Sequence, residues 1–196
     1  MVVVDAIRIA VHMLDDLQDN SEHLGAILRL TRRTCLEEAE YMASRWGVKT
    51  IGPTVPSAYL DNRIPDDTSY GFHLYTPMTA ETKAWLDKMP AHSVIYVSFG
   101  SLAAPSAEQM SEVAKVLYDS GKAFLWVVRS SENSKIPEGF ANKTKERGLI
   151  VTWSPQLMVL GHPAIGCFVK HCGWNSTMEG LSAGTPMVAM SQIPMV

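Results

Sequence analysis

The second half of the chain alternates between short apolar segments and segments whose apolar residues recur at helical spacing. The apolar segments are rich in β-branched and aromatic residues and lie at 93–98, 123–128, 148–153, 165–171 and 186–190. Strands that are apolar throughout are buried on both faces, and helices between successive strands make them parallel. The sequence therefore predicts an α/β domain, a doubly wound parallel sheet, over residues 93–196.

Helices are predicted between these strands. Ser106 and Gln109 have the spacing of a capping box, apolar residues follow at helical spacing, and Gly121 is typical of a helix end. A second helix is predicted over residues 174–182, directly after the fourth apolar segment.

The first 92 residues differ from the rest. Residues 1–46 carry apolar residues at helical spacing, which predicts a helical N-terminal segment appended to the sheet domain. Residues 47–92 contain several prolines and turn formers, so we expect a surface linker with one short helix near residues 80–88. A chain of 196 residues fits one domain plus an appendage, since domains usually span roughly 100–200 residues.

Composition excludes several classes of function. The chain has 17 Lys and Arg against 20 Asp and Glu, so its formal charge of −3 does not favour nucleic acid or an anionic membrane as partner. Three cysteines are too few for a disulfide scaffold and suit a reducing compartment. No apolar run reaches the roughly 18 residues that span a bilayer, and the N-terminus lacks a targeting pattern. We expect a soluble, cytoplasmic protein with no membrane span.

Polar residues follow three of the predicted strands, at residues 99–101, 153–156 and 171–177. In open parallel sheets, ligands bind beyond the carboxyl ends of the strands. These three segments are therefore candidates for one shared crevice.

The third segment has the features of a phosphate site. His171 ends a strand, Gly173 allows close backbone approach, and Asn175 and Ser176 lie in the first turn of the following helix. Free N–H groups and the positive end of the helix dipole favour anions there. Glu179 lies one turn deeper on the same helix face, where a carboxylate can accept both hydroxyls of a ribose.

The second segment has residues that could bind the base of a nucleotide. Trp153 offers a flat face for a nucleobase, and the amide of Gln156 can pair with the base edge. Each residue also has a structural interpretation: Trp153 as core, the residues after Gly173 as a helix cap, and His171 as a buried core histidine. Taken together, they favour a site for base, ribose and diphosphate.

Other ligands are less compatible with the residue spacing. A zinc site would need Cys167, His171 and Cys172 together, but successive strand residues point to opposite faces, so we predict no metal. No G-x-G-x-x-G occurs, and residues 161–166 have P-loop spacing without the following lysine. An NAD-type Rossmann domain is therefore disfavoured.

The segment that carries most of these residues resembles a known family. Residues 153–192 read WSPQLMVLGHPAIGCFVKHCGWNSTMEGLSAGTPMVAMSQ. This resembles the signature box of plant secondary-product UDP-glycosyltransferases, inverting family 1 enzymes with two facing Rossmann-like domains, the GT-B architecture. Residues 48–67 (VKTIGPTVPSAYLDNRIPDD) and 93–103 (SVIYVSFGSLA) extend the resemblance.

The resemblance implies a role for each candidate residue. Trp153 would stack on uracil, Ser154 and Gln156 would hold its edge, and Glu179 would hold the ribose hydroxyls. The diphosphate would be bound by Ser101, His171, the backbone at Trp174, Asn175 and Ser176. The donor would be a UDP-sugar, with UDP-glucose favoured, and the acceptor a small plant-type metabolite such as a flavonoid, phenolic acid or terpenoid. The family uses no metal for this transfer.

The resemblance also implies what this sequence lacks. The family's box continues past Gln192 with an acidic residue and a glutamine that grip the sugar, whereas here Ile193 and three further residues follow. The family's general base is a histidine of the N-terminal acceptor domain, and neither His12 nor His23 has its sequence context, so no catalytic residue is assigned. We expect weak UDP binding and slow or absent transfer. The alternative is a non-catalytic, truncated protein that binds a nucleotide or docks with a full-length relative.

Overall fold

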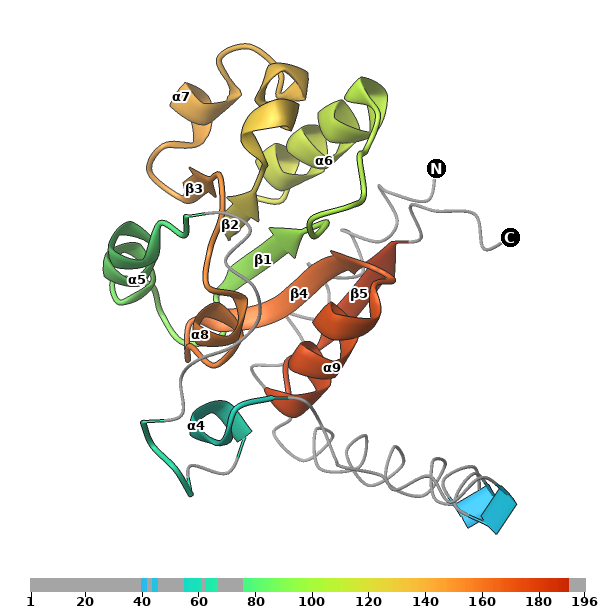
Figure 1. Cartoon of the computed structure of the whole chain (residues 1–196). Coiled ribbons are helices and arrows are strands. Elements are labelled where there is room, and N and C mark those ends of the chain that lie inside the picture. The colour runs from blue at the N-terminus through green and yellow to red at the C-terminus, as the bar shows by residue number, and fades with distance from the viewer. Residues whose placement is uncertain (1–39, 42–43, 46–54, 61–62, 67–75, 191–196) are drawn as a thin grey trace.

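The computed structural model describes residues 40–41, 44–45, 55–60, 63–66 and 76–190. Most of the predicted helical segment 1–46 and much of the predicted linker lie outside the described residues, as do residues 191–196; the four described residues of that segment, 40–41 and 44–45, are helical. The division of the chain at residues 46 and 92 therefore stays a prediction. The sheet domain is described almost completely (Figure 1).

The sheet has five strands, all parallel, in the order β3-β2-β1-β4-β5. The strands are β1 (Val94–Ser98), β2 (Ala123–Val127), β3 (Gly148–Val151), β4 (Ile165–His171) and β5 (Met187–Met190). All five predicted strands and the predicted doubly wound α/β fold are thus confirmed. These strands are apolar along their whole length because helices cover both faces of the sheet.

Seven helices are described alongside these strands. They are α4 (Ser57–Leu60), α5 (Thr79–Leu86), α6 (Ala107–Asp119), the 3₁₀ helix η1 (Ser130–Lys135), α7 (Phe140–Thr144), α8 (Gln156–Leu160) and α9 (Trp174–Ser182). The predicted capping box is present, because the Ser106 hydroxyl accepts from the Gln109 amide N–H and the Gln109 side chain accepts from the Ser106 N–H. The sequence did not predict α4, η1, α7 or α8, which are too short to show a helical period.

Two apolar clusters hold the helices on opposite faces of the sheet. One joins α6 and α7 to the face that carries Val97 and Trp126. The other joins α5 and α8 to the face that carries Tyr96 and Phe168, whose rings stack with centroids 4.7 Å apart. Figure 1 shows α6 and α7 on one side of the sheet, with α5, α8 and α9 on the other.

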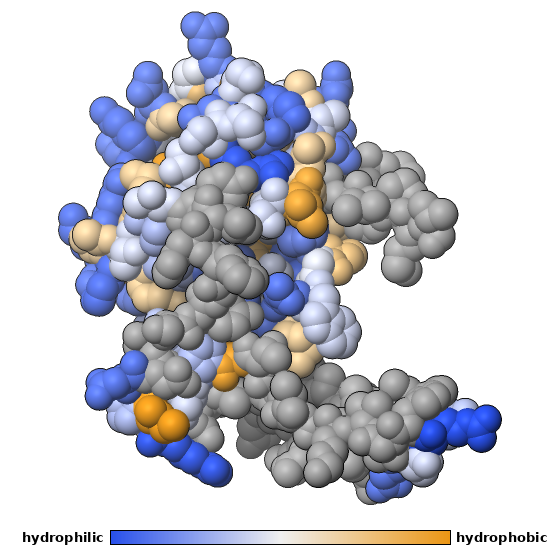
Figure 2. Space-filling model, viewed as in Figure 1, coloured by the Kyte–Doolittle hydropathy of each residue, from blue (hydrophilic) through white to orange (hydrophobic). Residues whose placement is uncertain are grey.

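Because the strands are parallel, the candidate segments lie together at the carboxyl end of the sheet. β1 and β4 are neighbours although β2 and β3 lie between them in sequence, so the chain changes direction across the sheet at this pair. Ligands bind at such switch points, beyond the carboxyl ends of the strands. On the side seen in Figure 2 the described surface is largely hydrophilic, with small separate apolar patches. Two large exposed apolar side chains, Leu102 and Trp174, follow β1 and β4.

Candidate functional site

A polar network joins the ends of β1 and β3 to α9. The Tyr96 hydroxyl lies 3.1 Å from the Ser154 hydroxyl and donates to Gln156 Oε1 at 3.4 Å. The Gln156 amide donates to the Ser176 hydroxyl at 3.0 Å and to the Glu179 carboxylate. Ser154, Ser176 and Glu179 are buried, each less than a tenth exposed. The structure thus brings together four of the residues predicted from sequence.

The network fixes the side chains that would meet a nucleoside. Gln156 is the first residue of α8, so its backbone position is set by the turn that leaves β3. Burial raises the pKa of Tyr96 above its ordinary value, which keeps its hydroxyl protonated and able to donate. Tyr96 was predicted only as a strand residue, and its link to the site is the contact of its hydroxyl with Ser154 and Gln156, which follow β3.

His171 lies between two backbone segments that have no side chain. A Cβ added at Gly100 would lie 2.5 Å from His171 Cε1, and one added at Gly173 would lie 2.2 Å from Nε2. The close approach predicted at Gly173 is therefore made by the His171 ring. Burial, and then the Lys170 charge, lower the His171 pKa, so the ring is neutral near pH 7. Its Nδ1 atom is buried and makes no hydrogen bond within the described part of the chain.

The first turn of α9 has no side-chain cap. Gly173 is the N-cap residue with extended dihedral angles, and no side chain accepts from the N–H groups of that turn. The interpretation of Asn175 and Ser176 as ordinary capping residues is therefore wrong. The turn also carries no acidic residue, so nothing in it opposes an anion at the positive end of the helix. Trp174 and Asn175 are exposed there.

Trp153 lies beyond the end of β3 and is half-buried. Its side chain packs against the apolar cluster under α5 and α8, and its carbonyl accepts from the Met78 N–H at 3.0 Å. The core interpretation thus accounts for the buried part of this side chain, and the base-stacking interpretation stays a prediction. The segment leading into α5 crosses the sheet edge beside it.

A charged cluster that sequence reasoning missed holds the loop after β1. The Arg129 guanidinium donates to the carbonyls of Ser101 and Ala103, and it lies 3.8 Å from Glu132. Glu132 also accepts from Lys135, which lowers the Glu132 pKa. Arg129 lies two residues after the end of β2, and this position close to a strand end was the available signal. The loop after β1, which carries Ser101, is therefore anchored by its backbone.

Among the described residues, no group of three His, Cys, Asp or Glu residues is arranged to hold a metal ion. Cys167, within β4, is buried, and burial raises its pKa to about 12, whereas Cys172, just after β4, is exposed. None of the described helices has the length and apolar character needed to cross a membrane.

The edge of the sheet therefore offers three adjoining features: an aromatic face with an amide, a buried carboxylate, and an uncapped helix N-terminus beside a neutral histidine. These fit the base, ribose and phosphates of a nucleotide. The fold and site together define a nucleotide-binding unit of the Rossmann-like α/β class.

Comparison with known proteins identifies the family. A sequence model of the family "UDP-glucoronosyl and UDP-glucosyl transferase" matches residues 18–194. Crocetin glucosyltransferase 2 of Crocus sativus is 58% identical over 145 residues, covering 74% of this chain and 32% of the relative. Mogroside I-E synthase of Siraitia grosvenorii is 51% identical over 156 residues, covering 78% of this chain and 34% of the relative. The chain belongs to the UDP-glucoronosyl and UDP-glucosyl transferase family, which confirms the resemblance.

Solved structures agree with this assignment. The crystal structure of Os79 from O. sativa in complex with UDP matches with a TM-score of 0.72 and 48% identity, over 79% of this chain and 34% of that one. Phytolacca americana UGT2, complexed with UDP-2fluoro-glucose and pterostilbene, matches with a TM-score of 0.55 and 44% identity, over 60% of this chain and 27% of that one. The chain spans about a third of the length of the curated relatives it matches.

Proposed function

We propose that this chain is the UDP-sugar-binding part of a glycosyltransferase that moves glucose, or a related hexose, from its UDP-sugar to a small plant-type metabolite, with UDP-glucose the favoured donor. The acceptor group is a hydroxyl or carboxyl of a flavonoid, phenolic acid or terpenoid. The observation that carries the proposal is the uncapped N-terminus of α9, which adjoins the buried network of Gln156 and Glu179. The UDP bound in related structures supports it.

The nucleoside occupies the side of the crevice formed by β3 and α9. Uracil stacks on the accessible part of Trp153, with Ser154 and Gln156 at its edge. Glu179 accepts from the ribose hydroxyls. Because Glu179 is only 5% exposed, its charge interacts strongly with donors that enter the site.

The diphosphate occupies the N-terminus of α9. Donors converge there from the backbone at Trp174, the side chains of Asn175 and Ser176, the ring of His171, and Ser101 on the anchored loop. Negative charge grows on UDP as the bond to the sugar breaks, so fixed dipoles at this point lower the barrier to transfer. This chemistry requires no metal ion.

Proton removal from the acceptor needs a base that none of the described residues supplies. His162 does pair with Asp87, Nε2 to Oδ1 at 3.1 Å, but it accepts from the Ala164 N–H through its other nitrogen. This pair precedes β4 and so lies at the amino edge of the sheet, opposite the crevice. We therefore assign the base to an acceptor-binding domain, supplied by the N-terminal part of a longer protein or by a full-length relative.

We also propose a cytoplasmic location, which the cysteine content and the absence of a long apolar run support. Cell fractionation with an antibody against the chain tests it. Recovery in a membrane or organelle fraction would contradict it.

Calorimetry and a transfer assay test the function. UDP should bind the wild-type chain and bind Glu179→Ala much more weakly, because the buried carboxylate no longer accepts from the ribose. Identical null titrations would refute the nucleotide site. Incubation with UDP-glucose and a flavonol then tests transfer. Turnover comparable with that of a full-length enzyme would rule out the alternative, a non-catalytic nucleotide-binding protein.

A further inference from the structure

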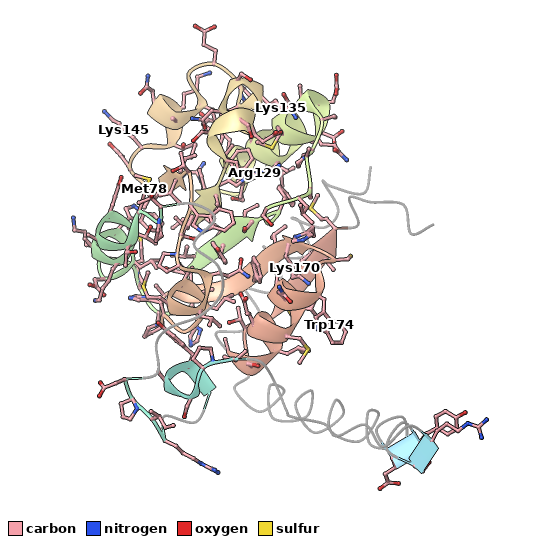
Figure 3. All side chains as sticks on the ribbon, viewed as in Figure 1. Met78, Arg129, Lys135, Lys145, Lys170 and Trp174 are labelled. Carbon is pink, nitrogen blue, oxygen red and sulfur yellow. The ribbon has the colours of Figure 1, made fainter. Side chains whose placement is uncertain are left out.

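Lys170, the residue before the end of β4, is buried beneath the candidate diphosphate site. Its side chain is among the largest fully buried ones and is 2% exposed. The ammonium donates to the Thr177 hydroxyl and, at 3.4 Å, to the Gly173 carbonyl. The Thr177 hydroxyl donates to the same carbonyl at 2.8 Å. Figure 3 shows Lys170 beside the first turn of α9, where Trp174 points outward.

The charge of Lys170 is not balanced. No carboxylate among the described residues lies within ion-pair distance of it, and its contacts are a hydroxyl and a carbonyl. The ionisable groups beside it are His171, which is neutral, and the Cys172 thiol. Burial lowers the Lys170 pKa, as expected for a cation removed from water.

The position of Lys170 next to a helix N-terminus adds to the free-energy cost of burying its charge. Cations are favoured at the C-terminal end of a helix and disfavoured at the N-terminal end, where the dipole is positive. An ammonium group has three N–H donors, and the structure accounts for two of them. A buried cation at this point is therefore unfavourable on its own and becomes favourable when an anion lies at the same turn.

We propose that Lys170 is a positioning residue for the diphosphate: its buried charge raises the anion affinity of the α9 N-terminus, and its contacts with Thr177 and Gly173 fix the first turn. This inference rests on the proposed function, because it assumes that the anion is the diphosphate of a UDP-sugar. It adds a full positive charge to a site otherwise built from dipoles and a neutral histidine. Because UDP is more negative than UDP-glucose, Lys170 favours the leaving group over the donor.

The test uses the full chain, three probes and three variants. The probes are uridine, UDP and inorganic pyrophosphate, which separate the nucleoside from the anion. Lys170→Met removes the charge and the hydrogen bonds, whereas Lys170→Gln removes the charge but keeps a donor for Thr177. Lys145→Met is the matched control, since it removes one exposed lysine next to α7, far from the crevice in Figure 3.

Loss of the charge should weaken anion binding alone. In both Lys170 variants, UDP and pyrophosphate affinity should fall roughly tenfold to a hundredfold, the usual effect of losing a contact with a charged group. Uridine affinity should stay unchanged, and Lys145→Met should resemble the wild type with every probe. The melting temperature of the ligand-free Lys170→Met chain should stay equal or rise, because an apolar side chain then replaces an unpaired buried cation. A purely structural lysine would instead lower the melting temperature and weaken all probes alike.

The remaining outcomes separate this inference from the function on which it rests. An unchanged ratio of UDP to uridine affinity in both Lys170 variants would overturn the role of Lys170 and leave the proposed function intact. Pyrophosphate binding that depends on Lys170, without any uridine binding, would refute the nucleoside site and support the anion site. A wild-type chain that binds neither UDP nor pyrophosphate would refute both. If Lys170→Met does not fold, Lys170→Gln provides the same comparison.

Discussion

Replacing Gly100 by alanine tests whether the His171 ring is held as tightly as the structure indicates. Gly100 has φ of +71°, and Gly121 has nearly the same φ of +66°. A Cβ at Gly100 meets the ring at 2.5 Å, whereas a Cβ at Gly121 meets nothing within 4 Å. The two substitutions therefore share the backbone strain and differ in the contact with His171.

The expected costs follow from these two terms. Left-handed backbone costs an alanine about 1–2 kcal/mol, and this applies to both variants. Overpacking adds about 1–3 kcal/mol at Gly100 only, because the ring also lies against the backbone at Gly173 and has little room to move. At roughly 2–4 °C per kcal/mol for a chain of this size, Gly121→Ala should lower the melting temperature by about 2–8 °C and Gly100→Ala by about 4–20 °C.

Differential scanning fluorimetry and UDP titration measure the two consequences separately. Gly100→Ala should also weaken UDP binding, since the displaced ring no longer faces the first turn of α9. Gly121→Ala should leave UDP affinity at the wild-type value, because Gly121 lies at the far end of α6. Equal melting temperatures and equal UDP affinities for the two variants would refute the wedged position of His171.

Three further predictions concern the surrounding network. Arg129→Met should weaken UDP binding more than uridine binding and destabilise the fold by about 1–3 kcal/mol, because backbone carbonyls of the loop after β1 lose a charged donor. Urea unfolding measures the stability and calorimetry the two affinities. Equal weakening of UDP and uridine binding would contradict this prediction. Gln156→Ala should cost about 1–3 kcal/mol of stability, since it leaves the buried Glu179 carboxylate without a donor that it has in the native network; wild-type stability in urea would contradict this. The pKa of His171 is lowered in the folded state from an ordinary value of 6.5, so the unfolded state binds the proton more readily and stability falls as pH drops below about 6.5. Between pH 8 and pH 5 the melting temperature should therefore fall less for His171→Gln than for the wild type. An equal fall in the two proteins would contradict the shift.

The strands and the main helices were predictable because their sequence patterns are local. Continuous apolar runs mark buried parallel strands, and the capping box at Ser106 marks the start of α6. The clustering of Ser154, Gln156, Ser176 and Glu179 was predictable as well, because the carboxyl ends of parallel strands meet at one edge.

Other features depend on tertiary contacts that no local pattern encodes. The helices α7 and α8 have five residues each, too few for a hydrophobic period to be visible. Arg129 contacts backbone carbonyls of a loop that is distant in sequence, so no sequence motif predicts these contacts. Lys170 lies within an apolar run, and no sequence pattern predicts that its ammonium group contacts the first turn of α9.

The network that runs from Tyr96 through Gln156 to Glu179 has a consequence for selectivity among nucleotides. Its side chains are already restrained by one another, so little conformational entropy is lost on the protein side when uridine enters. A rigid site adapts poorly to a wrong ligand. A 2′-deoxyribose would leave the buried Glu179 carboxylate with one hydroxyl donor instead of two, and a larger purine base would meet the restrained side chain of Gln156. On the proposed binding mode, we therefore expect the interior of the sheet domain to discriminate against deoxynucleotides and purine nucleotides.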